Sequence, residues 1–371
     1  MAIDLLVVHA PSGAGHKSAA LAVVEQARAR GLQVVMLELF DDAPRGIELA
    51  YAGFHRLGRT RLPTLYSRAM SLTNAGTPGY GALRRLVTRG LFLRFTRRVR
   101  ELAPRAIVST HHLPLAVLAA AKLAGTIEAR IIGLVTDHHA EAVWAQAGVD
   151  NFAVPGSEAL FGLVKHGIDA AKITTTGLPV EPALYTLSDC VARDHHATHR
   201  VLVAGTGFSP DELRAVIRSF ARIVNVRVNI LCGLDADLRD LAQRELDRAL
   251  VRGEALGHVK SVAPNLEGAD LFVGHAGGAS VHEAMAAGRT MVSVNAATAE
   301  ERANERFLLR SDGGRASLAE DVGRVFEELV ATDALARLGA NGRRATLVHA
   351  ARSVVEQATT PFWQAIRSAA A

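Results

Sequence analysis

Short apolar runs alternate with longer amphipathic segments along the whole chain. In the first half the runs that predict strands are Ile3–His9, Gln33–Leu39, Ala106–Thr110, Arg130–Thr136, Asn151–Pro155 and Lys172–Thr176. In the second half they are Arg200–Ala204, Arg227–Cys232, Val259–Val262, Leu271–Gly274 and Thr290–Val294. Several runs are continuous rather than alternating, as in strands that are covered on both faces. The pattern predicts an α/β protein with two domains, each built on a parallel sheet.

A change of pattern near the middle of the chain marks the expected domain boundary. Residues 186–199 are polar and poor in helical pattern, and a new apolar run with its own glycine-rich turn follows them. We therefore expect an N-terminal domain over residues 1–186 and a C-terminal domain over residues 199–355. Residues 356–371 contain Phe362 and Trp363, so a terminal helix there can pack back on the N-terminal domain.

Composition narrows the class of protein. The 371 residues are 49% hydrophobic and 21% charged, which is typical of a globular chain with a full core. Two cysteines, Cys190 and Cys232, exclude a disulfide framework, and no Cys-x-x-Cys pair is present for zinc. No apolar stretch approaches the ~20 residues of a membrane span, and no basic region precedes an apolar run at the N-terminus. We expect a protein of a reducing compartment with no signal peptide, membrane span or metal site.

Positive charge is concentrated in one segment of the chain. The net charge is +5, and residues 49–100 contain eleven arginines and no acidic residue. From Tyr80 to Leu102, arginines and apolar residues suit a basic amphipathic helix, which favours binding to an anionic membrane surface. The arginines expected at that surface are Arg84, Arg85, Arg89, Arg97 and Arg98. Nucleic acid is a weaker alternative because no nucleic-acid-binding motif accompanies the segment, and an ordinary solvated helix face is another.

The first glycine-rich loop lies between the first predicted strand and the first predicted helix. It runs from His9 to Lys17 and contains Gly13, Gly15 and His16. Its glycines let the backbone approach a ligand, and the helix N-terminus that follows favours an anion. His16 stands at the entrance to the helix, where an imidazole that titrates near neutrality can act as a general base. A histidine that only caps the turn fits the sequence equally well.

The second half contains two further glycine loops. Gly205 and Gly207 follow its first strand, which is a weak signal because any tight turn between a strand and a helix gives it. Gly277 and Gly278 precede a helix whose N-terminus can hold a diphosphate, and Glu283 is placed to accept hydrogen bonds from ribose hydroxyls. The polar residues near the Gly277–Gly278 loop are His275, Ser280 and Glu283. Downstream, Glu300, Glu301 and Asn304 open another predicted helix near the same edge of the sheet. A tight crossing of helix and sheet explains the glycines but not His275, Ser280 and Glu283 at this spacing.

Together these motifs resemble glycosyltransferase family 28, and most closely its diacylglycerol glycosyltransferase branch, the monogalactosyl- and glucosyl-diacylglycerol synthases. The resemblance runs from residue 1 to about residue 330 as an ordered series of motifs. The blocks that carry it are Gly13–His16, Val108–His111, Leu134–Asp137 with Trp144, Phe152–Pro155, Thr176–Val180, Asn229–Gly233, and Ala276–Ala284 followed by Glu301 and Asn304.

The resemblance implies a GT-B fold, in which two Rossmann-like domains face each other across a cleft. It implies inverting transfer of a hexose from a UDP-sugar substrate to diacylglycerol, with no cofactor and no metal. By position, His16 and Asp137 would be catalytic, near the acceptor hydroxyl, and Gly15, His111 and Trp144 would lie on the acceptor side. The residues implied on the donor side are Gly205 and Gly207; His275, Gly277, Gly278 and Ser280 for the diphosphate; Glu283 for the ribose; and Glu300, Glu301 and Asn304 for the sugar.

Four positions depart from the family pattern. His275 stands where the family usually has lysine, and Glu300 stands where it has glutamine. Gly205–Ser209 replaces a Gly-Gly-Gly-type loop, and Glu141 replaces a histidine. Three of these changes lie on the donor side.

These features predict a cytoplasmic glycosyltransferase, peripheral on the inner face of the cell membrane, that makes a glycosyl-diacylglycerol. Three alternatives stay open from the sequence. The acceptor can be another molecule, such as a polyprenyl-linked intermediate or a natural product. The chain can be a noncatalytic protein that binds a nucleotide sugar. It can also be a nucleotide-sugar epimerase of the same architecture.

Overall fold

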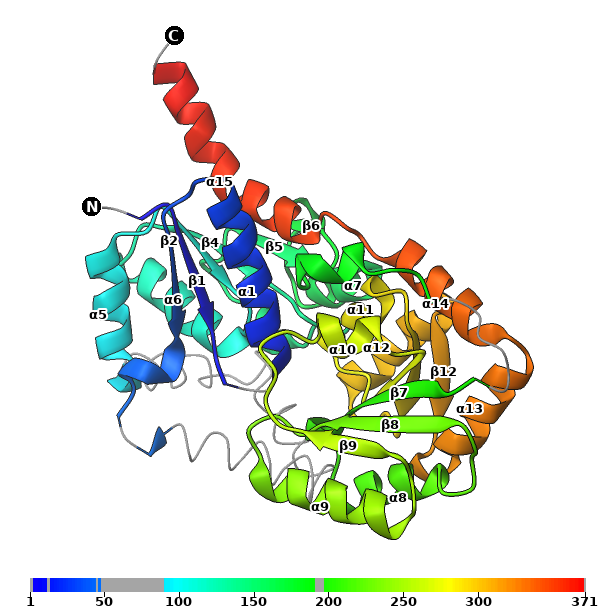
Figure 1. Cartoon of the computed structure of the whole chain (residues 1–371). Helices are drawn as coiled ribbons and strands as arrows, with labels where there is room; N and C mark the ends of the chain where they lie inside the picture. The colour runs from blue at the N-terminus through cyan, green and yellow to red at the C-terminus, as the bar shows by residue number, and fades with distance from the viewer. Residues whose placement is uncertain (1–2, 12–13, 45, 48–89, 191–196, 370–371) are drawn as a thin grey trace. The chain divides into compact units, whose positions relative to one another are not determined.

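The computed structural model describes residues 3–11, 14–44, 46–47, 90–190 and 197–369 (Figure 1). The chain divides into two compact units. The first unit is Met1–Val180 together with His349–Ala371, and the second is Glu181–Val348. The second unit is therefore an insertion between two parts of the first.

The first unit is built on a six-stranded parallel sheet. Its strands are β1 (Leu5–His9), β2 (Val34–Glu38), β3 (Ala106–Ser109), β4 (Arg130–Leu134), β5 (Asn151–Val154) and β6 (Ile173–Thr175). They lie in the order β2-β1-β3-β4-β5-β6. All six strands predicted in the first half are present, with ends shifted by two residues at most. The order reverses direction between β1 and β3, and the carboxyl ends of strands at such a reversal are where ligands bind in doubly wound sheets.

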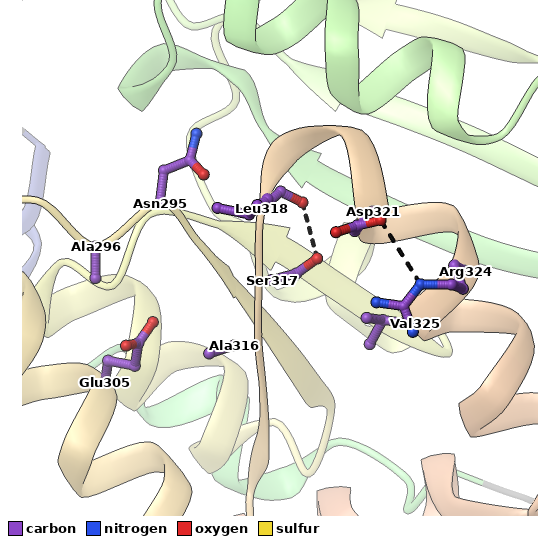
Figure 2. A pocket seen from close by; sticks show the side chains of 9 residues that line it. All are labelled: Asn295, Ala296, Glu305, Ala316, Ser317, Leu318, Asp321, Arg324 and Val325. Atoms are coloured by element: carbon purple, nitrogen blue, oxygen red, sulfur yellow. Dashed lines mark hydrogen bonds and ion pairs between the residues drawn. The ribbon is translucent and has the colours of Figure 1, made fainter.

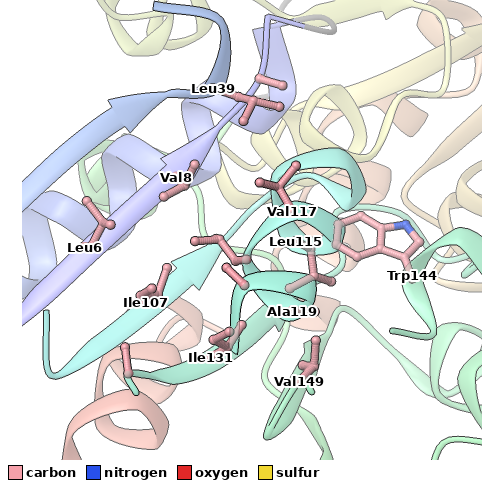
Figure 3. Packing of buried hydrophobic residues seen from close by; sticks show 14 of the residues in the cluster. Leu6, Val8, Leu39, Ile107, Leu115, Val117, Ala119, Ile131, Trp144 and Val149 are labelled. Atoms are coloured by element: carbon pink, nitrogen blue, oxygen red, sulfur yellow. The ribbon is translucent and has the colours of Figure 1, made fainter. Parts of the chain in front are cut away.

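Helices cover both faces of the first sheet. They are α1 (Ala14–Ala29), α5 (Leu93–Leu102), α6 (His112–Leu123), α7 (Ser157–Lys165) and α15 (Ala350–Ala369), with short 3-10 turns η1 (Leu39–Asp42), η2 (Ala142–Trp144) and η3 (Ala170–Lys172). Alternate residues of β1 enter different cores: Leu6 and Val8 pack with α5 and α6, whereas Leu5 and Val7 pack with α1 and α15. Figure 3 shows the first of these cores around Leu115 and Ile131. A strand buried on both faces needs a continuous apolar run, which β1 has.

The second unit contains the other six-stranded parallel sheet. Its strands are β7 (His199–Ala204), β8 (Val226–Leu231), β9 (Gly253–Leu256), β10 (Leu271–Gly274), β11 (Thr290–Val294) and β12 (Gly314–Ser317). The order β12-β11-β10-β7-β8-β9 is the doubly wound order of dinucleotide-binding domains, with its reversal between β7 and β10. The prediction of two parallel α/β domains is confirmed.

The helices of the second unit follow the strands in alternation. They are α8 (Pro210–Ser219), α9 (Ala236–Arg248), α10 (Ala263–Glu267), α11 (Gly278–Ala286), α12 (Ala299–Arg310), α13 (Val322–Ala331) and α14 (Ala334–Ala345), with 3-10 turns η4 (Pro182–Thr186), η5 (Gly205–Gly207) and η6 (Ala319–Asp321). Side chains from α8, α13 and α14 form one apolar core with β7 and β8.

Two sequence-based assignments in the second unit need correction. The predicted strand Val259–Val262 is wrong: these residues form a loop that leads into α10. Pro264 lies at the start of that helix, and the Ser261 hydroxyl accepts a hydrogen bond from the Ala263 amide at 3.1 Å. The third strand of the unit is β9 instead, and β12 was missed because Gly314–Ser317 carries little apolar pattern.

The C-terminal boundary also differs from the expected one. Residues 349–355 belong to the first unit, whereas the sequence pattern placed the end of the C-terminal domain at residue 355. The physical reason is that Val354 and Val355 are fully buried in the core with α1. Arg30 of α1 adds an ion pair to Glu356 of α15 at 2.6 Å.

Part of the predicted basic helix lies in the described part of the chain. Helix α5 occupies Leu93–Leu102 and buries Phe95 and Val99, whereas the predicted helix from Tyr80 falls on residues 80–89 that lie outside the described residues. Within the described ranges, no helix combines the length and the apolar character that crossing a membrane requires.

Candidate active site

The first group of predicted site residues meets at the carboxyl ends of β1, β3 and β4. His16 lies in the first turn of α1, which follows β1, and Thr110 directly follows β3. Thr136 and Asp137 follow β4. Parallel strands present their carboxyl ends on one edge of the sheet, so residues far apart in sequence converge there.

Hydrogen bonds fix the orientation and the tautomer of the His16 ring. Its Nδ1 lies 2.7 Å from the carbonyl oxygen of Thr110, which can only accept. Nδ1 therefore carries the proton, and the Nε2 lone pair is left as the basic site of a neutral ring. The Thr110 hydroxyl donates to the His16 carbonyl oxygen at 2.9 Å, which ties the start of α1 to the end of β3.

A threonine hydroxyl lies between His16 and Asp137. Thr136 Oγ1 is 3.2 Å from His16 Nδ1 and donates to Asp137 Oδ2 at 3.0 Å. Burial lowers the pKa of the His16 imidazole, and the Asp137 carboxylate and the Thr110 carbonyl offset this only in part. His16 is thus neutral at neutral pH, which is the state that a general base requires.

Rings from α6 and η2 continue the site away from His16. The His16 and His111 ring centroids are 4.6 Å apart, His111 stacks on His112 at 4.2 Å, and His112 meets Trp144 edge-on at 6.0 Å. His111 Nδ1 also accepts from the Leu113 amide at 3.0 Å and so caps α6. The structure brings the predicted acceptor-side residues His111 and Trp144 into one row with His16, and Gly15 precedes it in α1.

The second group lies at the carboxyl ends of β7 and β10, where the order of the second sheet reverses. A Cβ at Gly205 would lie 2.9 Å from Ile230 Cγ2, so this glycine is needed for packing on β8. A Cβ at Gly207 would lie 3.4 Å from the His275 ring. At Gly277 a Cβ would meet only Ser280 Oγ, at 4.0 Å, and the φ of −68° suits any residue. Among the described residues, neither packing nor conformation requires glycine at 277, and as the N-cap of α11 it leaves room for a ligand to approach the backbone.

Helix α11 begins at Gly278, and its N-terminus carries the positive end of the helix dipole. Ser280 and Glu283 are partly exposed on this helix. His282, in contrast, is buried, bonds the Gly278 carbonyl at 2.9 Å through Nδ1 and stacks on Phe307.

His275 faces two carboxylates. Its Nε2 is 3.9 Å from Glu212 Oε1, its Nδ1 is 3.7 Å from Glu301 Oε1, and its ring lies 4.7 Å from that of Phe208. Neither ring nitrogen has a hydrogen-bond partner among the described residues. Burial raises the pKa of the Glu212 carboxyl, but hydrogen bonds from Asn295 and Ser209 outweigh this effect, and the net pKa is lowered.

Two residues expected at the donor sugar have other roles. Glu301 is 5% exposed, and its Oε2 accepts from the amides of Ala297 and Thr298 in a capping box at the start of α12. Asn304 is fully buried and donates to the Ala276 carbonyl at 2.9 Å. Both side chains therefore hold the glycine loop and α12 in place, because a carboxylate in a first helical turn satisfies amides that the helix leaves open. Glu300 is partly exposed on the same turn.

A cavity of about 450 Å3 opens beyond the ends of β11 and β12 (Figure 2). It is lined by Asn295, Ala296, Glu305, Ala316, Ser317, Leu318, Asp321, Arg324 and Val325. Glu305 accepts from the Ser293 hydroxyl at 2.6 Å, and Asp321 pairs with Arg324 at 3.6 Å. Sequence reasoning missed this cavity, although Asn295 and Leu318 each directly follow a strand, where the carboxyl-end rule points.

The predicted membrane-facing arginines are only partly described. Arg84, Arg85 and Arg89 lie outside the described residues. Arg97 pairs with Glu101 at 2.9 Å and Arg98 with Asp42 at 3.2 Å, and both are exposed on α5.

Comparison with known proteins connects this arrangement to sugar transfer. Residues 16–180 match the family model described as monogalactosyldiacylglycerol (MGDG) synthase. An uncharacterized glycosyltransferase of Bacillus subtilis (strain 168), YkoN, is 22% identical over 296 residues, which cover 79% of this chain and 78% of that protein. The resemblance to family 28 is therefore confirmed, and with it the prediction that the chain is an enzyme that transfers glycosyl groups.

Solved structures show the same fold. Acinetobacter baumannii MurG is 16% identical, with a TM-score of 0.62 over 96% of this chain and 99% of that one. The S. aureus MnaA–UDP co-structure is 12% identical, with a TM-score of 0.60 over 95% of each chain. Anabaena Alr3699/HepE in complex with UDP is 13% identical, with a TM-score of 0.57 over 96% of this chain and 100% of that one. At these identities the likeness concerns the fold alone, and it confirms the GT-B prediction.

Proposed function

We propose that this chain, a GT-B glycosyltransferase of the family 28 type, transfers a hexose from a UDP-sugar to diacylglycerol with inversion at the anomeric carbon. The observation that carries the proposal is the neutral His16 ring, fixed by the Thr110 carbonyl so that Nε2 is the basic site. It begins the segment that matches the MGDG synthase model. Inverting transfer needs a base of this kind on the acceptor side.

The reaction begins with the acceptor hydroxyl. His16 Nε2 takes the hydroxyl proton as the oxygen attacks the anomeric carbon, and Nδ1–H stays bonded to the Thr110 carbonyl. The new bond joins the acceptor oxygen to the sugar. The bond from the sugar to the diphosphate breaks, and its electron pair leaves with UDP. The positive charge that develops on His16 is balanced by Asp137, which raises the pKa of the ring.

The departing diphosphate needs positive potential on the donor side. The N-terminal end of α11, with its helix dipole, and the backbone at Gly277 supply it without a side-chain cation. Glu283 on the same helix accepts hydrogen bonds from the ribose. UDP is the nucleotide we favour, because Alr3699/HepE and MnaA, which share the fold, were each solved with UDP.

The hexose requires partners other than those expected from the sequence, since Glu301 and Asn304 are committed to α12 and the glycine loop. We assign it to Glu300 and to the cavity beyond β11. Asn295 at the cavity edge donates to Glu212, which also faces His275. Glu305 follows Asn304 in α12, so one helix serves both the glycine loop and the cavity. Carboxylate and amide groups of this kind bind sugar hydroxyls.

Diacylglycerol is the acceptor we favour because the MGDG synthase model matches the part of the chain that carries His16, His111 and Trp144. A lipid acceptor also accounts for the eleven arginines of residues 49–100, which would hold the enzyme on the inner, anionic face of the membrane. A polyprenyl-linked or soluble acceptor, and binding of a nucleotide sugar without transfer, are the competing functions.

The test supplies donor and acceptor separately. The purified full chain is incubated with UDP-glucose or UDP-galactose and with phosphatidylglycerol vesicles that contain or lack diacylglycerol. Glycolipid is measured by mass spectrometry and released UDP by a coupled assay. We expect both products only when diacylglycerol is present, and neither from the His16→Ala variant.

Three other outcomes would contradict the proposal. If UDP is released only with a soluble or polyprenyl-linked acceptor, that molecule and not diacylglycerol is the acceptor. Conversion of the donor with no acceptor present would indicate an epimerase or a hydrolase. Tight UDP binding without any turnover would indicate a noncatalytic protein.

A further inference from the structure

Thr136 is a buried residue of the first unit for which sequence reasoning assigned no role. Its side chain stands between the His16 ring and the Asp137 carboxylate, 3.2 Å from Nδ1 and 3.0 Å from Oδ2. The residue is 4% exposed, so water does not compete freely for its hydroxyl. The threonine has one hydroxyl proton and two neighbouring groups that can share a hydrogen bond with it. Which neighbour receives that proton depends on where the neighbours carry their own protons.

The direction of that proton can be derived. The Thr110 carbonyl accepts from His16 Nδ1 at 2.7 Å, so Nδ1 is protonated and cannot accept a proton from Thr136. The Thr136 proton is then directed to Asp137, and an oxygen lone pair faces Nδ1–H. The three groups form a hydrogen-bonded chain, in which Nδ1–H is shared between the Thr110 carbonyl, its nearer partner, and Oγ1, and the Oγ1 proton points to the carboxylate.

We propose that Thr136 is the positioning residue of His16: its hydroxyl supports the ring, whose Nδ1–H tautomer the Thr110 carbonyl fixes, and transmits the negative charge of Asp137 to it. The inference rests on the proposed function, in which His16 is the base. It assigns Asp137 to the orientation and charge of His16 rather than to direct proton abstraction, a choice that the sequence left open. Hydrogen bonds of this kind stabilise the imidazolium that forms when Nε2 takes the acceptor proton.

Other charged and titratable groups face His16 and set the background for its titration. Asp137 follows β4 and favours the protonated ring. His9 at the end of β1 interacts electrostatically with His16, and the pKa of His9 is itself lowered by burial and by Lys17. His111, at the start of α6, packs edge-on against the ring at 4.6 Å. Of these groups, only Asp137 is joined to His16 through a hydroxyl.

The test compares two substitutions of almost equal size. Thr136→Val keeps the branched shape and removes the hydroxyl, whereas Thr136→Ser keeps the hydroxyl. The full chain is labelled with 15N-histidine, and the His16 signal among the 15 histidines is assigned by its loss in His16→Ala. Ring 15N shifts report the tautomer and the pKa of His16 without any substrate.

We expect Thr136→Val to lower the His16 pKa, because a methyl group replaces the hydroxyl that linked Nδ1–H to the Asp137 carboxylate, while the Thr110 carbonyl keeps the Nδ1–H tautomer. Asp137→Asn should lower the pKa in the same direction, and Thr136→Ser should match the wild type. In transfer assays, Thr136→Val should reduce kcat about tenfold, as for the loss of one hydrogen bond to a charged group, with the donor KM unchanged. The acidic limb of the kcat/KM profile should move with the NMR pKa.

An unchanged pKa in folded Thr136→Val would overturn the inference and leave the Thr110 carbonyl as the sole anchor. Equal losses in the valine and serine variants would also overturn it, since both would then reflect packing. If the NMR shifts follow the expected pattern but no variant, nor the wild type, transfers sugar, the positioning role stands and the proposed function fails. Circular dichroism melts identify a variant that does not fold, and Thr136→Ala then replaces valine.

Discussion

The two units open in the same way, with a buried strand, a glycine loop and a helix, but they use that opening for different chemistry. After β1 the loop leads to His16, a side chain whose ring can take a proton. After β7 the loop Gly205–Gly207 has no titratable group, and Gly205 is explained by packing on Ile230. In the second unit the groups that we propose for the diphosphate are backbone amides at the start of α11. The comparison teaches that the same strand–loop–helix opening does not decide whether side chains or backbone amides carry the chemistry.

The surroundings of the two histidines make the same distinction. Burial keeps the His16 ring neutral by lowering its pKa, and the Thr110 carbonyl, which accepts from Nδ1–H, leaves Nε2 as the basic site. His275 lies between Glu212 and Glu301, at 3.9 and 3.7 Å. A protonated His275 would therefore be paired with acids of its own unit, and the charge of a diphosphate must be met mainly by α11.

The largest effect is expected when the side chain of His16 in the first unit is removed. His16→Ala should reduce kcat by roughly 10²–10⁴, the usual contribution of a general base. Its affinity for UDP, measured by calorimetry, should be unchanged, because the donor elements lie in the other unit. A variant with wild-type kcat would exclude His16 from the mechanism.

The wild-type pH profile follows from the same residue. Since burial lowers the pKa of His16 below the ordinary 6.5, the neutral base persists to lower pH than a free imidazole would. The value of kcat/KM should therefore rise with pH through an apparent pKa below 6.5 and then remain level. A profile that rises only above pH 7 would contradict the neutral, buried ring.

A smaller effect is expected where the second unit depends on its backbone. Gly277→Ala places a methyl group where only Ser280 Oγ lies nearby, at 4.0 Å, so the unliganded fold should lose less than about 1 kcal/mol, as at a helix N-cap. The affinity for UDP should fall about tenfold, because the methyl group stands where the diphosphate approaches. Melting curves without nucleotide provide the control. An unchanged affinity for UDP would show that the diphosphate does not bind at Gly277.

The smallest effect concerns the surface of the first unit. Arg97 and Arg98 already pair with Glu101 and Asp42, so we expect less than the ~1 kcal/mol that a free arginine gains near an anionic surface. The double variant Arg97→Gln, Arg98→Gln should lower binding to phosphatidylglycerol vesicles only about two- to fivefold in sedimentation assays. The matched control is Arg244→Gln on the exposed side of α9 in the second unit, which should change nothing.

If wild-type binding does not depend on the anionic lipid content, the basic segment is an ordinary solvated surface. If the double variant abolishes binding, Arg97 and Arg98 act as free cations in spite of their partners.

Much of the fold was predictable because buried parallel strands need continuous apolar runs. Leu271–Gly274 and Thr290–Val294 were predicted to the residue. The prediction of a strand at Val259–Val262 was wrong because the run contains Lys260 and Ser261, and the Ser261 hydroxyl and Pro264 lead the chain into α10 instead. Strand β12 was missed for another reason, since it is held by pairing with β11 rather than by apolar content.

The candidate site was predictable only in part. His16 and the glycine loops could be predicted because they are local sequence motifs. Thr110 and Thr136 act on a ring that lies 94 and 120 residues away in sequence, so their role depends on the strand order. Glu301 and Asn304 match the motif, and only the structure shows that they also support the loop: Glu301 accepts from the Thr298 amide and Asn304 donates to the Ala276 carbonyl.

The insertion of the second unit into the first has a consequence for synthesis on the ribosome. The apolar sides of α1, β3 and β4 stay partly uncovered until Val354, Val355 and Ala358 of α15 emerge, after the whole second unit. The N-terminal unit is thus the last to be completed, against the usual order in which domains fold as they are made. A chain that stops at Val348 keeps every residue of both sites and still lacks the helix that closes its first sheet.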